Sequence, residues 1–418
     1  MHHNRVLQLS ASPNGGNWGG SPTRTAGWRI RIVATATLVL LGACARDAHR
    51  GLTIDVADSA GTVIVSHPTE WRQNLPLIAP DSAVTIGVAE GSLDLQFHRI
   101  VSVEFVQGGI LVADGGSNEI RRFSNRGEIL HRWGGSGDGP GEFRRLRWAT
   151  SIADTVYAWD ESSRRLTVYD EAGNVAHVVR PTFFGGSAPQ RVVGMFADHT
   201  LIVNPLEISS QPRIGAGVRA GDSPIAVAGW DDAALRPFTT VPGRPIYASS
   251  DGIRVPIPFT TYPAYSVAAS SLIIGNGATH EFTRYSESGA ALRTTRFVPE
   301  RVVTAADLAR YIDAYLESRR DGDASDIERA AKEAPVPEFM PTFDELAAQR
   351  SGATWIRTFT LPWDTVAEWV LLDSTGVASA RLRTQPQFII ADATAESVVG
   401  IVRDSLGVEY IEVLWYSQ

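Results

Sequence analysis

The chain has 418 residues, of which 44% are hydrophobic and 20% charged, a balance typical of a globular protein. This length allows two or three ordinary domains or one large repeat domain, whose core would not need disulfides for stability. Asp and Glu outnumber Lys and Arg by 46 to 38, and the only lysine is Lys332. The acidic balance argues against nucleic-acid binding, and the scarcity of lysine excludes most amine chemistry.

The first 43 residues have the pattern of an export signal. Residues 1–23 are rich in Gly, Ser, Asn and Pro, and they precede Arg24, Arg29, Arg31 and the ten-residue apolar stretch Ile32–Leu41. A basic region, a short apolar stretch and small residues predict a secretory signal peptide. Ten residues are too few to span a bilayer core of about 30 Å. Without this segment the chain has 34 basic and 46 acidic residues, a net charge of −12.

Cys44 ends this segment in the sequence LGAC and is the only cysteine of the chain. The sequence resembles the lipobox of bacterial lipoproteins, in which the cysteine is acylated and becomes the mature N-terminus. The alternative is a small buried thiol, since a single cysteine cannot form an internal disulfide. Ala45 replaces the Asp of that family's inner-membrane retention signal. The resemblance therefore implies lipid anchoring to the outer membrane, facing the periplasm.

One pattern recurs from residue 85 onward with a period of about 46 residues. Its clearest copies are residues 108–143 and 154–181, where short β-rich runs alternate with turns of Gly, Asn, Asp and Ser. Fainter copies lie at 271–297 and 369–383. The aligned pairs of the two clear copies are Asp114 with Asp160, Ile120 with Leu166, Phe123 with Tyr169, and Gly127 with Gly173.

The repeat predicts the fold. Short strands joined by turns indicate antiparallel sheet, and a period of about 40–50 residues is typical of a propeller blade. We predict an all-β fold, a six-bladed β-propeller of four-stranded antiparallel blades over residues 76–418. Residues 44–75 are predicted as a lipid-anchor tether and an N-terminal hairpin. We expect Asp114 and Asp160 to cap turns rather than to catalyse a reaction.

Two further segments are expected to complete the propeller. The C-terminal residues 397–416 are predicted as a hairpin. In closed propellers a strand from one terminus joins a blade made by the other, which removes open edges. Either the N-terminal hairpin or a strand around residues 84–87 could supply it.

Residues 301–353 are predicted as a helical insertion. Thr304 and Asp307 have the spacing of a capping box, and Leu308, Tyr311 and Tyr315 fall on one helical face. Residues 335–343 contain three prolines and break any helix. We expect the helices to cap one face of the propeller.

The segment 110–130 resembles an NHL-type repeat. Together with 134–143 and 154–173 it resembles the bacterial six-bladed β-propeller lipoproteins related to NHL-repeat and TolB-like propellers. The match is good over 85–181 and weaker over 271–297 and 355–418. The resemblance implies a binding or scaffold module for a peptide, glycan or protein partner. The alternative is a metal-dependent hydrolase or lyase, because gluconolactonase-like propellers gather metal ligands from separate blades around the axis.

Local motifs for catalysis are absent from the sequence. The glycine-rich segment 132–143 completes neither phosphate-binding glycine motif, and Asp138 and Glu142 would repel a phosphate. No histidines are paired at metal-ligand spacing, and residues 321–332 lack the glycine and the final glutamate of a calcium loop. The motif G-x-S-x-G, which holds a serine nucleophile, is also missing. We therefore predict no catalytic residue, no metal and no cofactor, and leave open whether the protein is an enzyme.

Four aromatic residues cluster just after the insertion: Trp355, Phe359, Trp363 and Trp369. They are candidates for a surface on which a glycan or an apolar ligand stacks. The alternative is ordinary packing of strands.

The lipobox interpretation is tested by Cys44→Ala. We expect this variant to remain uncleaved by the lipoprotein signal peptidase and unlabelled by palmitate, because the acyl acceptor is gone. Radiolabelled palmitate and gel mobility measure both effects, with wild type as the positive control. Palmitate labelling of Cys44→Ala would refute the assignment.

Overall fold

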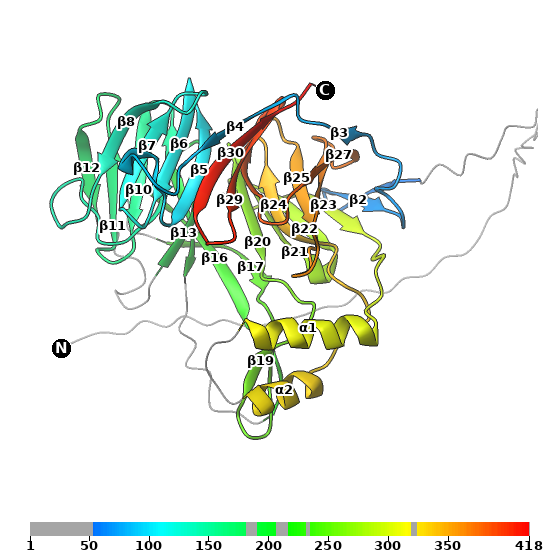
Figure 1. Cartoon of the computed structure of the whole chain (residues 1–418). Coiled ribbons are helices and arrows are strands. Elements are labelled where there is room, and N and C mark those ends of the chain that lie inside the picture. Colours follow the sequence, from blue (N-terminus) through cyan, green and yellow to red (C-terminus); the bar gives the residue numbers. More distant parts are fainter. Residues whose placement is uncertain (1–52, 181–189, 206–215, 231–234, 319–323, 418) are drawn as a thin grey trace, which may run out of the picture. The chain divides into compact units, whose positions relative to one another are not determined.

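The computed structural model describes residues 53–180, 190–205, 216–230, 235–318 and 324–417, so Cys44 and the predicted signal segment lie outside it. Strands dominate this part of the chain (Figure 1). Within it, six sheets share a core of four antiparallel strands, in which most strands pair with the next strand along the chain.

The first three sheets have the following strands: β5 (Ile100–Val106), β6 (Gly109–Asp114), β7 (Glu119–Phe123) and β8 (Ile129–Gly134); β9 (Leu146–Ile152), β10 (Thr155–Asp160), β11 (Arg165–Tyr169) and β12 (Val175–Val179); β13 (Gln190–Met195), β14 (Thr200–Pro205), β16 (Asp222–Gly229) and β17 (Arg236–Pro242).

The other three sheets have these strands: β20 (Ala264–Ala268), β21 (Ser271–Asn276), β22 (Glu281–Ser286) and β23 (Ala291–Phe297); β24 (Phe343–Ala348), β25 (Thr354–Thr358), β26 (Ala367–Leu372) and β27 (Ala378–Thr384); β28 (Ile389–Ala393), β29 (Ser397–Arg403), β30 (Glu409–Trp415) and β4 (Ser82–Ile86).

The first strands of these sheets form a closed ring. β5 contacts β9, and contacts continue through β13, β20, β24 and β28 back to β5. Apolar side chains pack between neighbouring sheets, as Leu111 and Ala113 do with Val156 and Ala158. Sheets arranged in this way around a common axis make a β-propeller. The predicted all-β propeller with four-stranded antiparallel blades is confirmed.

The ring is closed by a strand from the N-terminal side. β4 pairs antiparallel with β30, with Val84 opposite Val413, and thus becomes the fourth strand of the last sheet (Figure 1). Of the two expected closing segments, the strand around residues 84–87 is the one used. The N-terminal hairpin of β1 (Asp55–Ser59) and β2 (Thr62–His67) instead extends another sheet, where β2 lies parallel to β23. The short β3 (Leu77–Ile78) lies parallel to β27.

The helical insertion contains α1 (Ala305–Glu317) and α2 (Ala324–Glu333). The predicted capping box is present: Asp307 N donates to Thr304 Oγ1, and Thr304 N donates to Asp307. The insertion ends before residue 343, at least eleven residues earlier than expected, because β24 (Phe343–Ala348) begins there. Asp344 and Glu345 interrupt the apolar alternation of β24, which hid this strand in the sequence.

A small separate sheet accompanies the helices. It consists of β15 (Gly217–Arg219), β18 (Ile246–Ala248) and β19 (Arg254–Pro256). Val255 of β19 packs with Ile327 and Ala330 of α2 and with Tyr315 of α1. The insertion therefore has a minor hydrophobic core of its own.

Asp114 and Asp160 are fully buried at equivalent places in their repeats. Asp114 accepts hydrogen bonds from Arg99 N and Gly116 N, both at 2.9 Å. Asp160 accepts from Arg144 N at 2.9 Å and from Ser162 N at 3.1 Å. Each aspartate therefore caps its own turn, as predicted, and also holds the crossover that leads into the first strand of its sheet.

A buried arginine completes each of these contacts. Arg165 lies 3.8 Å from Asp160 and donates to the carbonyls of Asp138 and Gly139, and Arg121 lies 3.9 Å from Asp114. The glycine-rich segment 132–143 is thereby fixed as a crossover between two sheets. Gly134 and Gly141 have φ values of 94° and 80° there, a conformation that favours glycine.

Replacing a buried aspartate should destabilise the propeller more than replacing an exposed one. Asp160→Ala leaves the buried Arg165 without its carboxylate, and we expect a loss of about 3–5 kcal/mol in the free energy of unfolding. Asp114→Ala should cost less than Asp160→Ala, because Arg121 keeps its ion pair of 2.6 Å with Glu119. Asp58→Ala removes one exposed hydrogen bond, from Gly61 N, and is expected to cost less than about 1 kcal/mol. Urea unfolding measures all three, and equal losses would contradict the structural role.

Candidate functional site

An axial cavity of about 430 Å³ opens where the first strands of the six sheets end. All six ring strands contribute to its wall, for example through Glu104 of β5, Ser266 of β20 and Asp392 of β28. Ligand sites in proteins are commonly of this size and combine apolar walls with a few polar groups.

Glu104 is one of two carboxyl groups in the wall of this cavity whose pKa is raised. Its carboxylate accepts hydrogen bonds from Thr150 Oγ1 at 2.7 Å and from Ser151 N, both of the neighbouring sheet. Burial raises the pKa of Glu104 to about 7, although these two donors and the charge of Arg350 lower it. The side chain therefore changes its charge close to neutral pH.

Asp392 of β28, the strand next to β5 in the ring, lies beside Glu104 in the cavity wall. It accepts hydrogen bonds from Phe105 N and Ala393 N, both at 2.8 Å. Burial raises the pKa of Asp392, and its charge contributes to the raised pKa of Glu104. The cavity thus presents two carboxylates that repel each other, with the guanidinium of Arg350 nearby.

Two side recesses adjoin the axial cavity and share Arg350 with it. Arg350 is exposed in the turn between β24 and β25, and it lines the axial cavity and both recesses. One recess, of about 550 Å³, extends along the sheet of β20–β23, and the other, of about 440 Å³, extends toward Gln107 and Thr394. We call the three connected hollows the trough. Gln349 bridges its rim, since its Nε2 donates to Thr394 O at 2.9 Å.

A smaller hollow of about 190 Å³ lies near the start of α1. Trp71, Met340 and Phe359 supply its apolar wall, while Arg72 and Glu300 form an ion pair of 3.2 Å at its edge. The already paired charges leave this hollow with fewer free polar groups than the trough.

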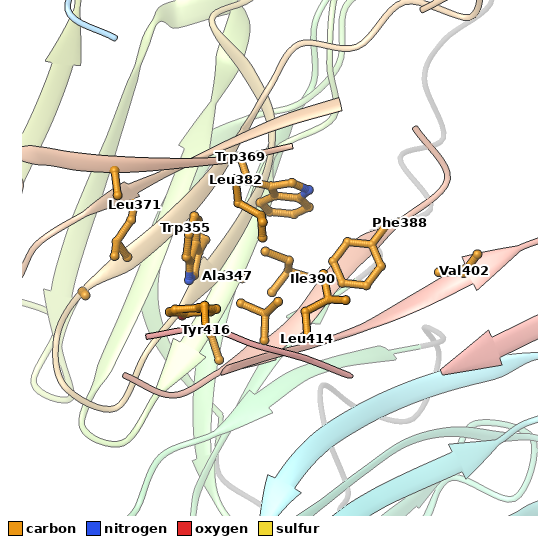
Figure 2. Packing of buried hydrophobic residues seen from close by; sticks show 14 residues of the cluster. Ala347, Trp355, Trp369, Leu371, Leu382, Phe388, Ile390, Val402, Leu414 and Tyr416 are labelled. Atoms are coloured by element: carbon orange, nitrogen blue, oxygen red, sulfur yellow. The ribbon is translucent and has the colours of Figure 1, made fainter. Parts of the chain in front are cut away.

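The structure separates the four aromatic residues predicted as a stacking surface. Trp355 and Trp369 are fully buried in a core cluster with Leu382, Phe388 and Tyr416 (Figure 2). These two side chains thus follow the alternative of ordinary strand packing, because β25 and β26 turn them into the core.

The other two aromatic residues lie beside α1. Phe359 lines the small hollow, and the guanidinium of Arg310 lies 4.5 Å from the ring centroid of Trp363. Both pack, together with Leu308 and Tyr311 of α1, against the buried cluster of Phe259, Met340 and Leu361. Phe359 and Trp363 therefore remain candidates for ligand contact, and Trp355 and Trp369 do not.

Sequence reasoning missed the polar residues of the trough. Glu104, Arg350 and Asp392 belong to three different sheets and have no common motif. The available signal was weak: Glu104 and Asp392 each interrupt an apolar run near the end of a first strand. Only the closed ring brings them together.

Two further findings concern only the residues that the structure describes. They hold no grouping of three or more His, Cys, Asp or Glu residues suited to a metal ion. None of the helices placed there has the length and apolar character needed to cross a membrane.

Comparison with known proteins supports the fold. No family model and no curated protein matches the chain in sequence. Among solved structures, a member of the DUF4221 family from Bacteroides vulgatus is 9% identical, with a TM-score of 0.51 over 83% of this chain and 99% of that one. A calcium-binding protein, regucalcin, from Agrobacterium tumefaciens is also 9% identical, with a TM-score of 0.39 over 82% of this chain and 96% of that one. At such identities the likeness concerns architecture and does not extend to activity.

Glu104 should make the stability of the protein depend on pH. Its pKa is above the ordinary value of 4.5, so the stability it contributes is present below pH 4.5 and is lost as the pH rises through about 7. We expect wild type to lose on the order of 1–3 kcal/mol from this group between about pH 4.5 and pH 8, and Glu104→Gln to avoid that loss.

Urea unfolding across this pH range measures the effect. Glu90→Gln, at an exposed position, is the control and should follow wild type. A difference between wild type and Glu104→Gln that stays constant with pH would contradict the raised pKa.

Proposed function

We propose that this chain is an exported, lipid-anchored, six-bladed propeller that binds a polar ligand in the trough, as a binding or scaffold module. The observation that carries this proposal is the convergence of Glu104, Arg350 and Asp392, from three sheets, on connected hollows. Carboxylates and a guanidinium on a rigid ring are suited to orient hydrogen-bonding groups of a ligand.

The size of the trough favours an extended ligand. Each of its three hollows measures about 430–550 Å³, and each alone could hold a small molecule. A peptide segment or an oligosaccharide could occupy the connected hollows together. Hydroxyl and amide groups along the rim, from Ser351, Gln349 and Thr394, match the hydrogen-bonding groups of both ligand classes.

The proposed anchor rests on the sequence. Cys44 precedes β1 at Asp55 by eleven residues, which extend over at most about 40 Å. A lipid at Cys44 would keep the propeller close to the membrane surface. Outer-membrane placement facing the periplasm is part of this proposal, because Ala45 follows the cysteine.

A substitution that fills the axial cavity tests the binding function. Ala391 is exposed in β28 and lines the cavity, so Ala391→Trp places an indole inside it without burying a new residue in the core. We expect wild type to bind members of peptide or glycan arrays and Ala391→Trp to lose at least roughly tenfold in affinity, since the indole occupies the site.

The matched control is Ala57→Trp, at an exposed position of β1, which should bind as wild type does. Equal binding by Ala391→Trp and wild type would place the ligand elsewhere. Elemental analysis of the same purified protein tests the alternative of an axial metal-dependent hydrolase or lyase. Stoichiometric calcium or zinc would favour that alternative over a pure binding module.

A further inference from the structure

Two arginines lie directly opposite each other in the sheet that borders one recess of the trough. Arg284 of β22 pairs across the strands with Arg293 of β23, and their side chains are only 7% and 8% exposed. Like charges in such a pair destabilise a sheet. Burial, together with the neighbouring charge of Arg293, lowers the pKa of Arg284 to about 10. This face of the sheet thus holds more positive charge than its own contacts balance.

The contacts of Arg284 are all with neutral groups. Its Nη1 donates to Ser271 Oγ at 2.6 Å, and its Nη2 donates to Gly352 O at 2.8 Å and to Thr354 Oγ1 at 3.0 Å. Its Nε has no acceptor. A guanidinium carries five N–H groups, so two of them lack an acceptor here. Among the described residues no carboxylate forms an ion pair with Arg284.

The guanidinium of Arg293 also lacks acceptors for some of its N–H groups. Its Nη1 donates to Ser374 O, while its Nε and Nη2 are buried without an acceptor. Asp373 attracts Arg293 electrostatically without forming a direct ion pair with it. The positive charge of the pair is therefore compensated only in part by the protein.

The recess beside Arg284 is rich in hydroxyl groups. Arg284 contributes to its wall, Arg350 stands at its junction with the axial cavity, and Gly352 continues the rim. Ser286 and Ser288 hydrogen-bond to each other across 2.8 Å, so one hydroxyl proton of the pair is free for a ligand. The serines that line this recess are Ser270, Ser271, Ser286, Ser288 and Ser351.

We propose that this recess binds an oxyanion group of the trough's ligand, a carboxylate, phosphate or sulfate, between Arg284, Arg350 and the serine hydroxyls. Guanidinium and hydroxyl donors are the groups that bind such oxygens in proteins. The inference rests on the proposed function, because the recess is one arm of the trough. It adds the charge class of the ligand and the end of the trough at which that charge lies.

The carboxylate of Glu287 would repel an anion bound in this recess. Its side chain lines the recess, and burial followed by the charge of Asp198 raises its pKa. Protonation of Glu287 removes a like charge and adds a donor. Since Arg284, Arg293 and Arg350 stay charged at neutral pH, anion binding should become tighter as the pH falls through the titration of Glu287.

Calorimetric titration at constant ionic strength tests the proposal, with sulfate, phosphate and acetate as separate probes. Relative to wild type we expect Arg350→Gln to weaken binding at least roughly fivefold, since it removes a charge-assisted donor. Glu287→Gln should strengthen binding by about two- to fivefold, since it removes a repelling charge. Arg126→Gln changes the net charge equally at an exposed turn and serves as the control.

The three probes identify the oxyanion class, because the preferred one binds most tightly. Because Arg284 is buried, replacing it risks unfolding the chain. Its role is therefore tested without a substitution, by NMR on the wild-type protein. The NMR resonance of the Arg284 Nε–H should shift with sulfate in the same saturable manner as the heat. Sulfate should also bind more tightly at about pH 4.5, the ordinary pKa of a glutamate side chain, than at about pH 8.

Three outcomes would overturn the inference: no saturable binding of any probe, equal weakening by Arg350→Gln and Arg126→Gln, or an Arg284 Nε–H resonance that does not move. If Ala391→Trp weakens binding to the arrays and Arg350→Gln does not, the inference is also overturned, while the proposed function stays intact. If wild type binds neither the arrays nor any of the anions, both proposals are rejected.

Discussion

The pairing of β4 with β30 is the constraint on which the rest of the structure depends. It joins strands from opposite ends of the described chain and completes the last sheet of the ring. The axial cavity exists only in the closed ring, because all six first strands contribute to its wall. A ring opened at this point would expose the edge of β30 and separate Asp392 from Glu104.

The two ends of the ring are built differently, and this difference positions the trough. At the end where the first strands begin, buried aspartates and arginines such as Asp160 and Arg165 fix long crossovers. At the other end the first and second strands are joined by short turns, such as the one holding Arg350. Short turns leave the hollows uncovered, so unpaired polar groups remain accessible there.

Incomplete compensation of charge is common to the polar groups of the trough. Glu104 and Asp392 share one nearby guanidinium, and no carboxylate of the described residues forms a direct ion pair with Arg284 or Arg293. Each such group lowers the stability of the folded chain unless a ligand or a proton balances it. A rigid ring with a large apolar core tolerates this cost, and clusters of perturbed groups are typical of binding sites.

The local features could be predicted from the amino-acid sequence alone, because they depend on neighbours along the chain. The strand-and-turn repeat, the turn-capping Asp114 and Asp160, the capping box at Thr304 and the C-terminal hairpin all followed from spacing and residue type. The sequence could not show that β24 starts at Phe343, since the buried ion pair of Asp344 with Arg357 hides the alternation. Only the tertiary structure decided which strand closes the ring, that Trp355 and Trp369 are core residues, and that Glu104, Arg350 and Asp392 meet. The reason is physical: those side chains are brought together by ring closure, which no local pattern encodes.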